Sequence, residues 1–188
     1  MKLIVGLGNY PKEYEKTRHN VGFMVIDEWL KRHNLSLTEN KFKGWFIKFK
    51  NQYDEDWIAA KPYTYMNLSG QFVRDIVNFY NIDPQDILVI MDDVDLPVGT
   101  WRVKKTGSSG GQKGMKNIID LLYREDIKRI RIGISRPTHG DMVSWVTGKF
   151  SEDERKKVQP AILKSADFMD ELMCGTDFEK AVSKFNAK

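Results

Sequence analysis

The sequence predicts an α/β fold, namely a three-layer α/β/α domain with a mixed, mostly parallel twisted sheet flanked by helices. Two continuous apolar runs, 2–6 and 87–91, are typical of strands buried on both faces. Segments with helical periodicity, such as 21–33, alternate with these runs along the chain. A predicted hairpin over 45–60 adds an antiparallel pair to the sheet. With 188 residues and 41% hydrophobic content, we expect one domain over 1–188.

Each element follows from a local pattern. After the first strand, Phe23, Ile26 and Leu30 recur at helical spacing. Apolar and basic residues alternate in 45–50, and a polar turn separates this strand from the apolar run 57–60. The remaining expected elements are helices over 68–80 and 115–123, strands over 87–91, 101–104 and 130–134, and a helical C-terminal tail.

The cysteine content and the N-terminus indicate a cytoplasmic protein. Cys174 is the only cysteine, so it cannot form an internal disulfide, and no cysteine–histidine spacing suggests a metal site. The apolar run 2–6 is too short for a signal peptide, and no stretch approaches the roughly 20 apolar residues of a membrane span. We therefore expect no membrane association.

The basic residues are concentrated in one part of the chain. The formal net charge is +4, but the segment 100–136 contains ten basic and three acidic residues, a local balance of +7. A basic face attracts a polyanion within a Debye length, roughly 8 Å at physiological salt. This charge is compatible with binding of a polyanionic partner. It is equally compatible with cations that are scattered over several faces and only solvated.

The segment 6–20 contains the first candidate site. Its residues 6–11, Gly-Leu-Gly-Asn-Tyr-Pro, break the chain after the first strand, at a carboxyl end of the kind where open α/β sheets bind ligands. The two glycines suggest a dinucleotide-binding loop, but Pro11 stands where that motif requires a third glycine. His19 lies where the loop becomes a helix and is the main candidate for a functional residue. A buried histidine with a structural hydrogen bond is the alternative.

Asp92 is the candidate partner of His19. It directly follows the apolar strand 87–91, so we expect it at the same edge of the sheet. A carboxylate that accepts one ring N–H leaves the other ring nitrogen basic, as in hydrolysis through water. Asp92, Asp93 and Asp95 are a weaker candidate for a magnesium site, because no phosphate-binding motif accompanies them. A solvated acidic turn is the plain alternative.

Two asparagines precede predicted helices. We expect Asn20 to be the N-cap of the helix that begins at 21. Asn67, within the segment 65–70, most simply caps the next helix, although its amide could equally donate a hydrogen bond to a substrate carbonyl.

The segment 107–114, Gly-Ser-Ser-Gly-Gly-Gln-Lys-Gly, is a glycine-rich turn before a predicted helix. It is not a Walker phosphate loop, because Gln112 replaces a required glycine and Gly114 replaces the Ser or Thr that binds magnesium. Free backbone N–H groups at the start of a helix, together with Lys113, still favour an anion site.

The same glycine-rich segment fits the G-x-S-x-G motif of serine hydrolases. Ser109 would be the nucleophile and His139, further along the chain, the base. Many glycines make a flexible loop, whereas the motif requires a strained turn, and 188 residues are few for that fold. A serine esterase is nevertheless an alternative.

Together these motifs closely resemble those of the bacterial peptidyl-tRNA hydrolases. The matching segments are 6–9, 17–20, 65–70, 92–97 and 129–133, with Tyr14 and the glycine-rich loop in the same order. The resemblance spans essentially the whole chain and is densest over 4–136. Several motifs in order are more specific than any one of them.

The resemblance implies hydrolysis of the ester between a peptide and the 3′-terminal ribose of tRNA, which recycles stalled peptidyl-tRNA in translation. It implies that tRNA is the partner and that neither a metal nor an organic cofactor is needed. We also expect a monomer without a protein partner. By correspondence, His19 is the general base that activates water, and Asp92 is the carboxylate that orients His19. An ester has a good leaving group, so base-activated water and carbonyl donors suffice.

The resemblance also implies substrate-binding residues. Asn9 and Asn67 correspond to amides that hold the peptide and the reacting carbonyl, and Tyr14 and Met66 to residues that shape the pocket. Two cations, Lys104 and Arg131, match positions that bind the phosphate end of tRNA.

Two positions depart from the family pattern. The usual Gly-Asn-Pro-Gly loop is replaced by Asn9-Tyr10-Pro11-Lys12, which inserts a tyrosine and lacks the glycine, so the resemblance does not define the path of the loop near Asn9. Lys113 stands where many members have an asparagine, and we interpret it as a substrate-binding cation that contacts a phosphate or the ribose. A non-catalytic RNA-binding module, which would need no partnership between His19 and Asp92, is the last alternative.

Overall fold

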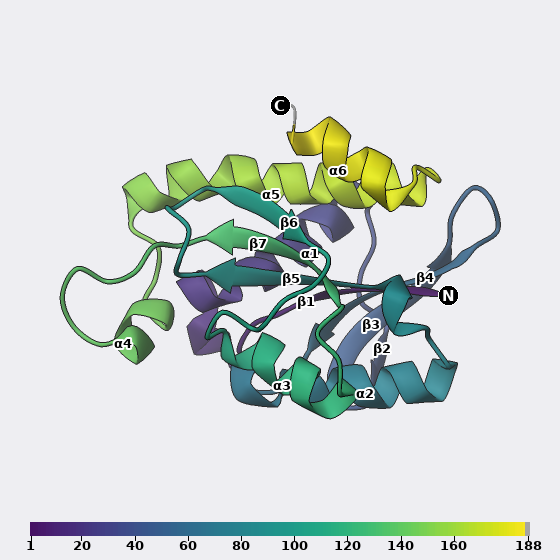
Figure 1. Ribbon diagram of the computed structural model, residues 1–188, viewed down its shortest axis with the longest axis horizontal. Coiled ribbons are helices and arrows are strands. Elements are labelled where there is room, and N and C mark those ends of the chain that lie inside the picture. The colour runs from purple at the N-terminus through teal and green to yellow at the C-terminus, as the bar shows by residue number, and fades with distance from the viewer. Residues whose placement is uncertain (187–188) are drawn as a thin grey trace.

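The computed structural model describes residues 1–186, and within them seven strands form one sheet (Figure 1). The strands are β1 (Lys2–Gly6), β2 (Glu39–Lys41), β3 (Gly44–Lys50), β4 (Asp56–Pro62), β5 (Ile87–Asp93), β6 (Trp101–Lys104) and β7 (Lys128–Gly133). Their order is β2-β3-β4-β1-β5-β7-β6. The central strands β4, β1, β5 and β7 are parallel, and the other strands join the two edges antiparallel. The predicted mixed sheet with a parallel centre is confirmed.

Helices cover both faces of the sheet. They are α1 (Val21–Arg32), α2 (Ser69–Tyr80), α3 (Lys113–Leu122), α4 (Met142–Val146), α5 (Glu152–Met173) and α6 (Phe178–Asn186), with short 3-10 turns η1 (Lys12–Tyr14), η2 (Arg18–Asn20), η3 (Met66–Leu68) and η4 (Pro84–Asp86). Figure 1 shows α2 and α3 below the sheet and α5 above it, with α6 packed outside α5. Among the described residues, no helix is both long and apolar enough to cross a bilayer.

The predicted elements lie within two residues of the observed boundaries from β1 to β7. Two short elements, β2 and α4, were not predicted, because neither is long enough to show a period. The helical tail is divided into α5 and α6 near Gly175, whose φ of 92° ends a helix without the strain that a side chain would add.

The central strands are buried on both faces, which explains their uninterrupted apolar sequence. In β1, Ile4 packs in the cluster shared with α1 and α5, whereas Leu3 and Val5 pack in the cluster shared with α2. Burying one such side chain contributes roughly 1.5–3 kcal/mol to the stability of the fold. The sheet is therefore a fixed platform for the loops at its carboxyl edge.

A close approach between β1 and α1 positions the loop that carries His19. A Cβ on Gly6 would lie 2.2 Å from the carbonyl oxygen of Gly22, and a Cβ on Gly22 would lie 2.5 Å from the backbone nitrogen of Leu7. A larger residue at either glycine would move α1 away from the end of β1. Because η2 immediately precedes α1, this contact also sets the distance between His19 and the end of β5.

Candidate active site

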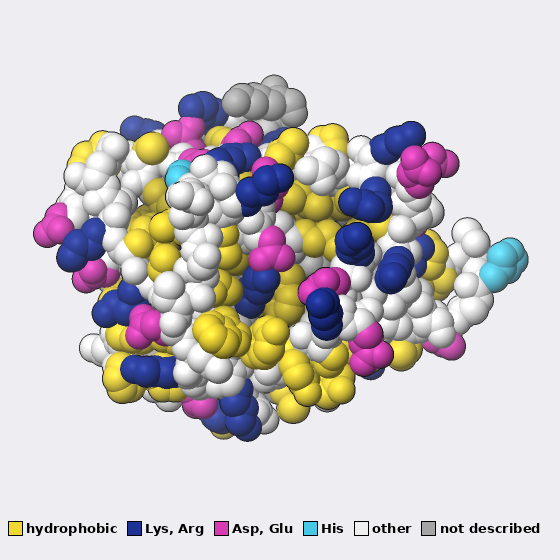
Figure 2. All heavy atoms as spheres, turned by 180° about the vertical axis from the view of Figure 1, so that it is seen from behind, with side chains coloured by type: hydrophobic (Ala, Val, Ile, Leu, Met, Phe, Trp, Pro, Cys, Tyr) yellow, Lys and Arg dark blue, Asp and Glu magenta, His cyan; other side chains and the backbone are white. Residues whose placement is uncertain are grey.

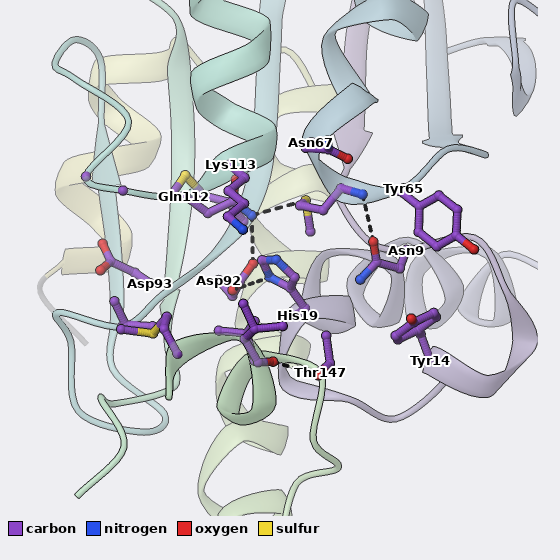
Figure 3. A pocket seen from close by; sticks show the side chains of 18 of the residues that line it. Asn9, Tyr14, His19, Tyr65, Asn67, Asp92, Asp93, Gln112, Lys113 and Thr147 are labelled. Carbon is purple, nitrogen blue, oxygen red and sulfur yellow. Dashed lines mark hydrogen bonds and ion pairs between the residues drawn. The ribbon is translucent and has the colours of Figure 1, made fainter. Parts of the chain in front are cut away.

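His19 and Asp92 form a buried hydrogen-bonded pair at the carboxyl edge of the sheet. Nδ1 of His19, in η2, lies 2.8 Å from Oδ2 of Asp92, near the end of β5 (Figure 3). Only 7% of His19 and 2% of Asp92 are exposed. Because an ionised carboxylate only accepts hydrogen bonds, this contact favours the ring tautomer with the proton on Nδ1 and the lone pair on Nε2. The structure thus brings together the two residues expected to meet.

Gln112 holds the second carboxylate oxygen of Asp92. Its Nε2 donates to Oδ1 of Asp92 over 2.9 Å, and its Oε1 accepts the backbone N–H of Met115 at 2.7 Å. The bond from Met115 fixes the orientation of the amide, because only the oxygen can accept it. Gln112 therefore caps α3 and orients Asp92 at the same time. This role was not predicted, because Gln is not among the residues that favour the N-cap position and the helix was expected to begin only at residue 115.

Asn9 is fixed by its backbone and its side chain. Its N–H donates to Oδ1 of Asn20 at 2.8 Å, its carbonyl accepts from Nδ2 of Asn20 at 3.0 Å, and its own Oδ1 accepts the N–H of Met66 at 2.7 Å. The Nδ2 group of Asn9 is left as a donor beside the cavity. Asn20 is the N-cap residue of α1, as predicted, but its side chain makes no capping hydrogen bond and binds the backbone of Asn9 instead. These bonds define the loop path that the Tyr10-Pro11 departure had put in doubt.

The other predicted pocket residues come from η1 and η3. Met66 is buried, with its sulfur 3.2 Å from Nε2 of Gln112. Tyr14 is half-buried and packs edge-on against Tyr65, with ring centroids 6.4 Å apart. Asn67 is exposed at the rim, and the prediction that it caps α2 is wrong, because Leu68 is the N-cap residue and no side chain caps that helix.

These side chains line an open cavity of about 440 Å³, which we call the His19 cavity. Figure 3 shows Tyr14 and Tyr65 on one side of His19, and Gln112 and Lys113 on the other. Residues of α4 complete the lining, namely Met142, Val143 and Val146, together with Thr147. This part of the site was not predicted from the sequence, because α4 itself was not predicted.

Arg18 attaches α4 and α5 to the turn that carries His19. Its guanidinium donates to Glu154 at 2.8 Å and to the carbonyl of Trp145 at 2.9 Å, and it stacks on the Trp145 ring at 3.5 Å. Burial alone would raise the pKa of Glu154, but the hydrogen bonds from Arg18 and from the N–H of Ser151 hold that pKa below its ordinary value. The ion pair with α5 is therefore formed at neutral pH, and the contacts of Arg18 with Trp145 hold α4 beside the cavity.

The adjacent carboxylates of β5 face opposite sides of the sheet. Asp92 binds His19, whereas Oδ2 of Asp93 accepts a hydrogen bond from Nη1 of Arg131 at 3.1 Å. Successive residues of a strand alternate in direction, so this division follows from the strand itself. The predicted tRNA-binding residue Arg131 is thus half-buried and already has an ionic partner.

Four cations share one face of the β6–β7 edge. The register pairs Arg102 with Arg131 and Lys104 with Arg129, and cross-strand partners point to the same face. Arg129 is 1% exposed and donates to the carbonyl of Ser108 at 2.7 Å, so it supports the glycine-rich loop. Lys104 is exposed and forms no ion pair within residues 1–186. The opposite side of the molecule from Figure 1, seen from behind in Figure 2, carries basic side chains interspersed with acidic and apolar ones.

Lys113 is the first residue of α3 and is exposed over the His19 cavity (Figure 3). In the part of the chain that the structure describes, it has no acidic partner. A cation with no partner at the mouth of a cavity is available to an anionic ligand.

Ser109 and His139 do not form a nucleophile and base pair. The hydroxyl oxygen of Ser109 accepts the N–H of Gly111 at 3.3 Å, and no hydrogen bond among residues 1–186 joins Ser109 to a histidine. His139 is exposed in the loop before α4. Within the same residues, no group of three or more His, Cys, Asp or Glu side chains is placed to hold a metal ion.

The fold and the site define an α/β enzyme whose cavity holds an imidazole oriented by a carboxylate. A profile of the family described as peptidyl-tRNA hydrolase matches residues 3–188. The chain belongs to the peptidyl-tRNA hydrolase family.

Individual relatives agree with this assignment. A peptidyl-tRNA hydrolase from Malacoplasma penetrans is 54% identical over 184 residues, which cover 98% of this chain and 97% of the relative. One from Listeria welshimeri is 44% identical over 186 residues, covering 99% of this chain and all of the relative. The crystal structure of the peptidyl-tRNA hydrolase from Acinetobacter baumannii matches 100% of this chain and 95% of its own, with a TM-score of 0.90 and 33% identity.

Proposed function

We propose that this enzyme hydrolyses the ester between a peptide and the 3′-terminal ribose of tRNA, which recycles stalled peptidyl-tRNA in translation. We further propose that it acts in the cytoplasm as a monomeric, single-domain enzyme without a metal or another cofactor. The observation that carries the proposal is the His19–Asp92 pair, which lies between the amide donor of Asn9 and the cation of Lys113, which has no acidic partner among residues 1–186.

In the mechanism that we propose, Nε2 of His19 removes a proton from a water molecule that attacks the ester carbonyl. Asp92 keeps the ring in the tautomer with a basic Nε2 and stabilises the imidazolium that forms. The imidazolium then returns the proton to the departing ribose oxygen, and the free acid of the peptide remains. No covalent intermediate is needed.

Asn9 and Asn67 would bind the acyl part of the substrate. The Oδ1 of Asn9 is occupied by the N–H of Met66, so its Nδ2 is oriented as a donor before substrate arrives. Such a fixed donor can stabilise negative charge that develops on a carbonyl oxygen. Tyr14 and Met66 would confine the acyl group beside these amides.

The cations would bind the tRNA part of the substrate. Lys104 and Arg131 share the face of the β6–β7 edge, and we propose that they contact phosphates near the acceptor end. Lys113 lies nearer to His19 and would contact a phosphate or the ribose of the terminal nucleotide.

Replacing His19 tests the mechanism most directly. His19→Ala is expected to lower kcat for release of N-acetylated amino acid from aminoacyl-tRNA by about 10²–10⁴-fold. Thermal unfolding of the same variant checks that it folds, and the assay is run with a chelator because no metal is invoked. Near-normal turnover in His19→Ala contradicts the mechanism. Binding of tRNA without any turnover by the unaltered chain would favour an RNA-binding module instead.

A further inference from the structure

Three exposed tyrosines form a contiguous group beside the His19 cavity. The ring of Tyr10 is 5.3 Å from that of Tyr65 and 5.4 Å from that of Tyr63, measured between centroids. The exposed fractions are 39% for Tyr10 and 47% for each of the other two. We call these residues the tyrosine cluster. Tyrosine presents a large apolar ring with a polar tip, which suits a surface that binds a ligand in water.

The tyrosine cluster continues the His19 cavity beyond Asn9. Tyr65 lines the His19 cavity, and Asn9 lines both this cavity and a second one of about 270 Å³ that is bounded by Tyr10 and Tyr63. The N–H of Tyr10 donates to the carbonyl of Thr64 at 3.0 Å, which joins the two segments that carry the cluster. A ligand leaving the cavity on the Asn9 side therefore meets these rings.

The surroundings of the tyrosine cluster do not favour a polyanion. Neighbouring Tyr10 and desolvation raise the pKa of the Tyr65 hydroxyl above its ordinary value, so this hydroxyl is uncharged at neutral pH. The nearby segment 12–16 contains two lysines and two glutamates, which balance. Lys113, by contrast, lies on the other side of His19 (Figure 3). Phosphates bind most strongly on the side of the cations, because opposite charges attract. The tyrosine side is then available to an uncharged part of the substrate.

We propose that the tyrosine cluster is a subsite for the peptide residues upstream of the one esterified to tRNA, and that it favours apolar and aromatic side chains. The proposal rests on the proposed function, because the ester then separates the tRNA from the peptide. An extended peptide advances about 3.3–3.6 Å per residue, and each ring-to-ring distance, 5.3 and 5.4 Å, exceeds one such step, so the cluster can contact more than one peptide residue. Tyr10 and Tyr63 line the second cavity and not the His19 cavity, so we expect them to contact a longer peptide and not a single blocked amino acid.

Two substrates on the same tRNA test this subsite, one with an N-acetylated single amino acid and one with an N-acetylated apolar tetrapeptide. Tyr10→Ala and Tyr63→Ala are expected to raise KM for the tetrapeptidyl substrate by about 2- to 12-fold, the range for loss of an aromatic contact. Both variants should leave KM and kcat for the single-residue substrate unchanged. Tyr10→Phe should retain most of the affinity, because it keeps the ring. Tyr53→Ala is the matched control, since Tyr53 is an exposed tyrosine in the turn between β3 and β4.

Each other outcome overturns the subsite. An equal rise in KM for both substrates would mean that the rings contact the tRNA or support the loop. No rise for either substrate would mean that the rings contact no part of the substrate. Absence of turnover by the unaltered chain would overturn the proposed function and the subsite together, whereas turnover with equal effects overturns the subsite alone.

Discussion

The two ends of the His19 cavity are built differently. At the amide end, Asn9 is held by three hydrogen bonds of 2.7–3.0 Å to Asn20 and Met66. At the cation end, Gly110 and Gly111 have positive φ and would meet nothing within 4 Å if a Cβ were added. Lys113 follows them without an acidic partner among residues 1–186. One end is fixed by buried polar contacts, and the other is open and carries free charge.

This difference matches the demands of the two parts of the proposed substrate. Attack on a carbonyl requires a base and a donor placed before the substrate binds, because reorganisation at that moment raises the barrier. A phosphate backbone is attracted by charge over several ångströms and tolerates variation in the contact. We therefore expect substitutions at the fixed end to lower kcat and substitutions at the open end to raise KM.

Asp92→Asn tests the fixed His19–Asp92 pair that lies between the two ends and has the largest expected effect in this comparison. Gln112 donates to Oδ1 of Asp92, so the carbonyl of an asparagine at 92 would keep that bond and its NH₂ would face Nδ1 of His19. His19 would then carry its proton on Nε2 and could no longer act as a base. We expect kcat to fall by about 10²–10⁴-fold with little change in KM, measured with N-acetylated aminoacyl-tRNA.

Asp93→Asn is the matched control for Asp92→Asn. It makes the same chemical change one residue further along β5, where the side chain faces Arg131 instead of His19. Its kcat should stay close to that of the unaltered enzyme. If the two variants lose kcat equally, loss of charge at this edge, and not the tautomer of His19, is the cause.

The sequence was sufficient to predict the fold and the pairing of His19 with Asp92. Continuous apolar runs and helical periods predicted the central strands and their helices, because both signals depend on burial. Strand ends also predicted that Asp92 would meet His19, since the carboxyl ends of β1 and β5 lie side by side in the parallel sheet. These features follow from local pattern and from one general property of parallel sheets.

The residues that hold Asn9 and Asp92 in place, Asn20 and Gln112, could not be predicted in the same way. Asn20 was expected to cap a helix, but it binds the backbone of Asn9, and the choice between these partners depends on how the loop folds back. Gln112 orients Asp92 from 20 residues away in sequence, a contact that exists only once α3 is packed. Side-chain hydrogen bonds between distant segments leave no periodic trace in a sequence.

Lys104→Ala tests the open end and has an intermediate expected effect. Lys104 has no ion pair to lose among the described residues, so its removal should act on the substrate alone. We expect KM to rise at low salt, and the slope of log KM against log salt concentration to decrease by about one, because one phosphate contact is lost. Arg131→Ala should act in the same direction, with its folding checked by thermal unfolding because Asp93 loses its partner.

Lys50→Ala is the control for both cation variants, since Lys50 is a lysine of β3 paired with Asp56 in the hairpin. Its KM should show the salt dependence of the unaltered enzyme. An effect of Lys104→Ala that does not vary with salt would indicate that Lys104 acts through packing, and the comparison between a fixed end and a charged end would then fail.

Ser109→Ala has the smallest expected effect and separates the backbone of the open end from its side chains. Ser109 accepts one long hydrogen bond of 3.3 Å from Gly111, so we expect the free energy of unfolding to change by less than about 0.5 kcal/mol. Since no histidine binds its hydroxyl, kcat and KM should also be unchanged in the tRNA assay. A complete loss of turnover would instead make Ser109 a nucleophile, and the glycine-rich loop would then belong to the chemistry. Retained turnover leaves the loop with the charge that its structure offers to a phosphate, namely the exposed cation of Lys113 at the start of α3.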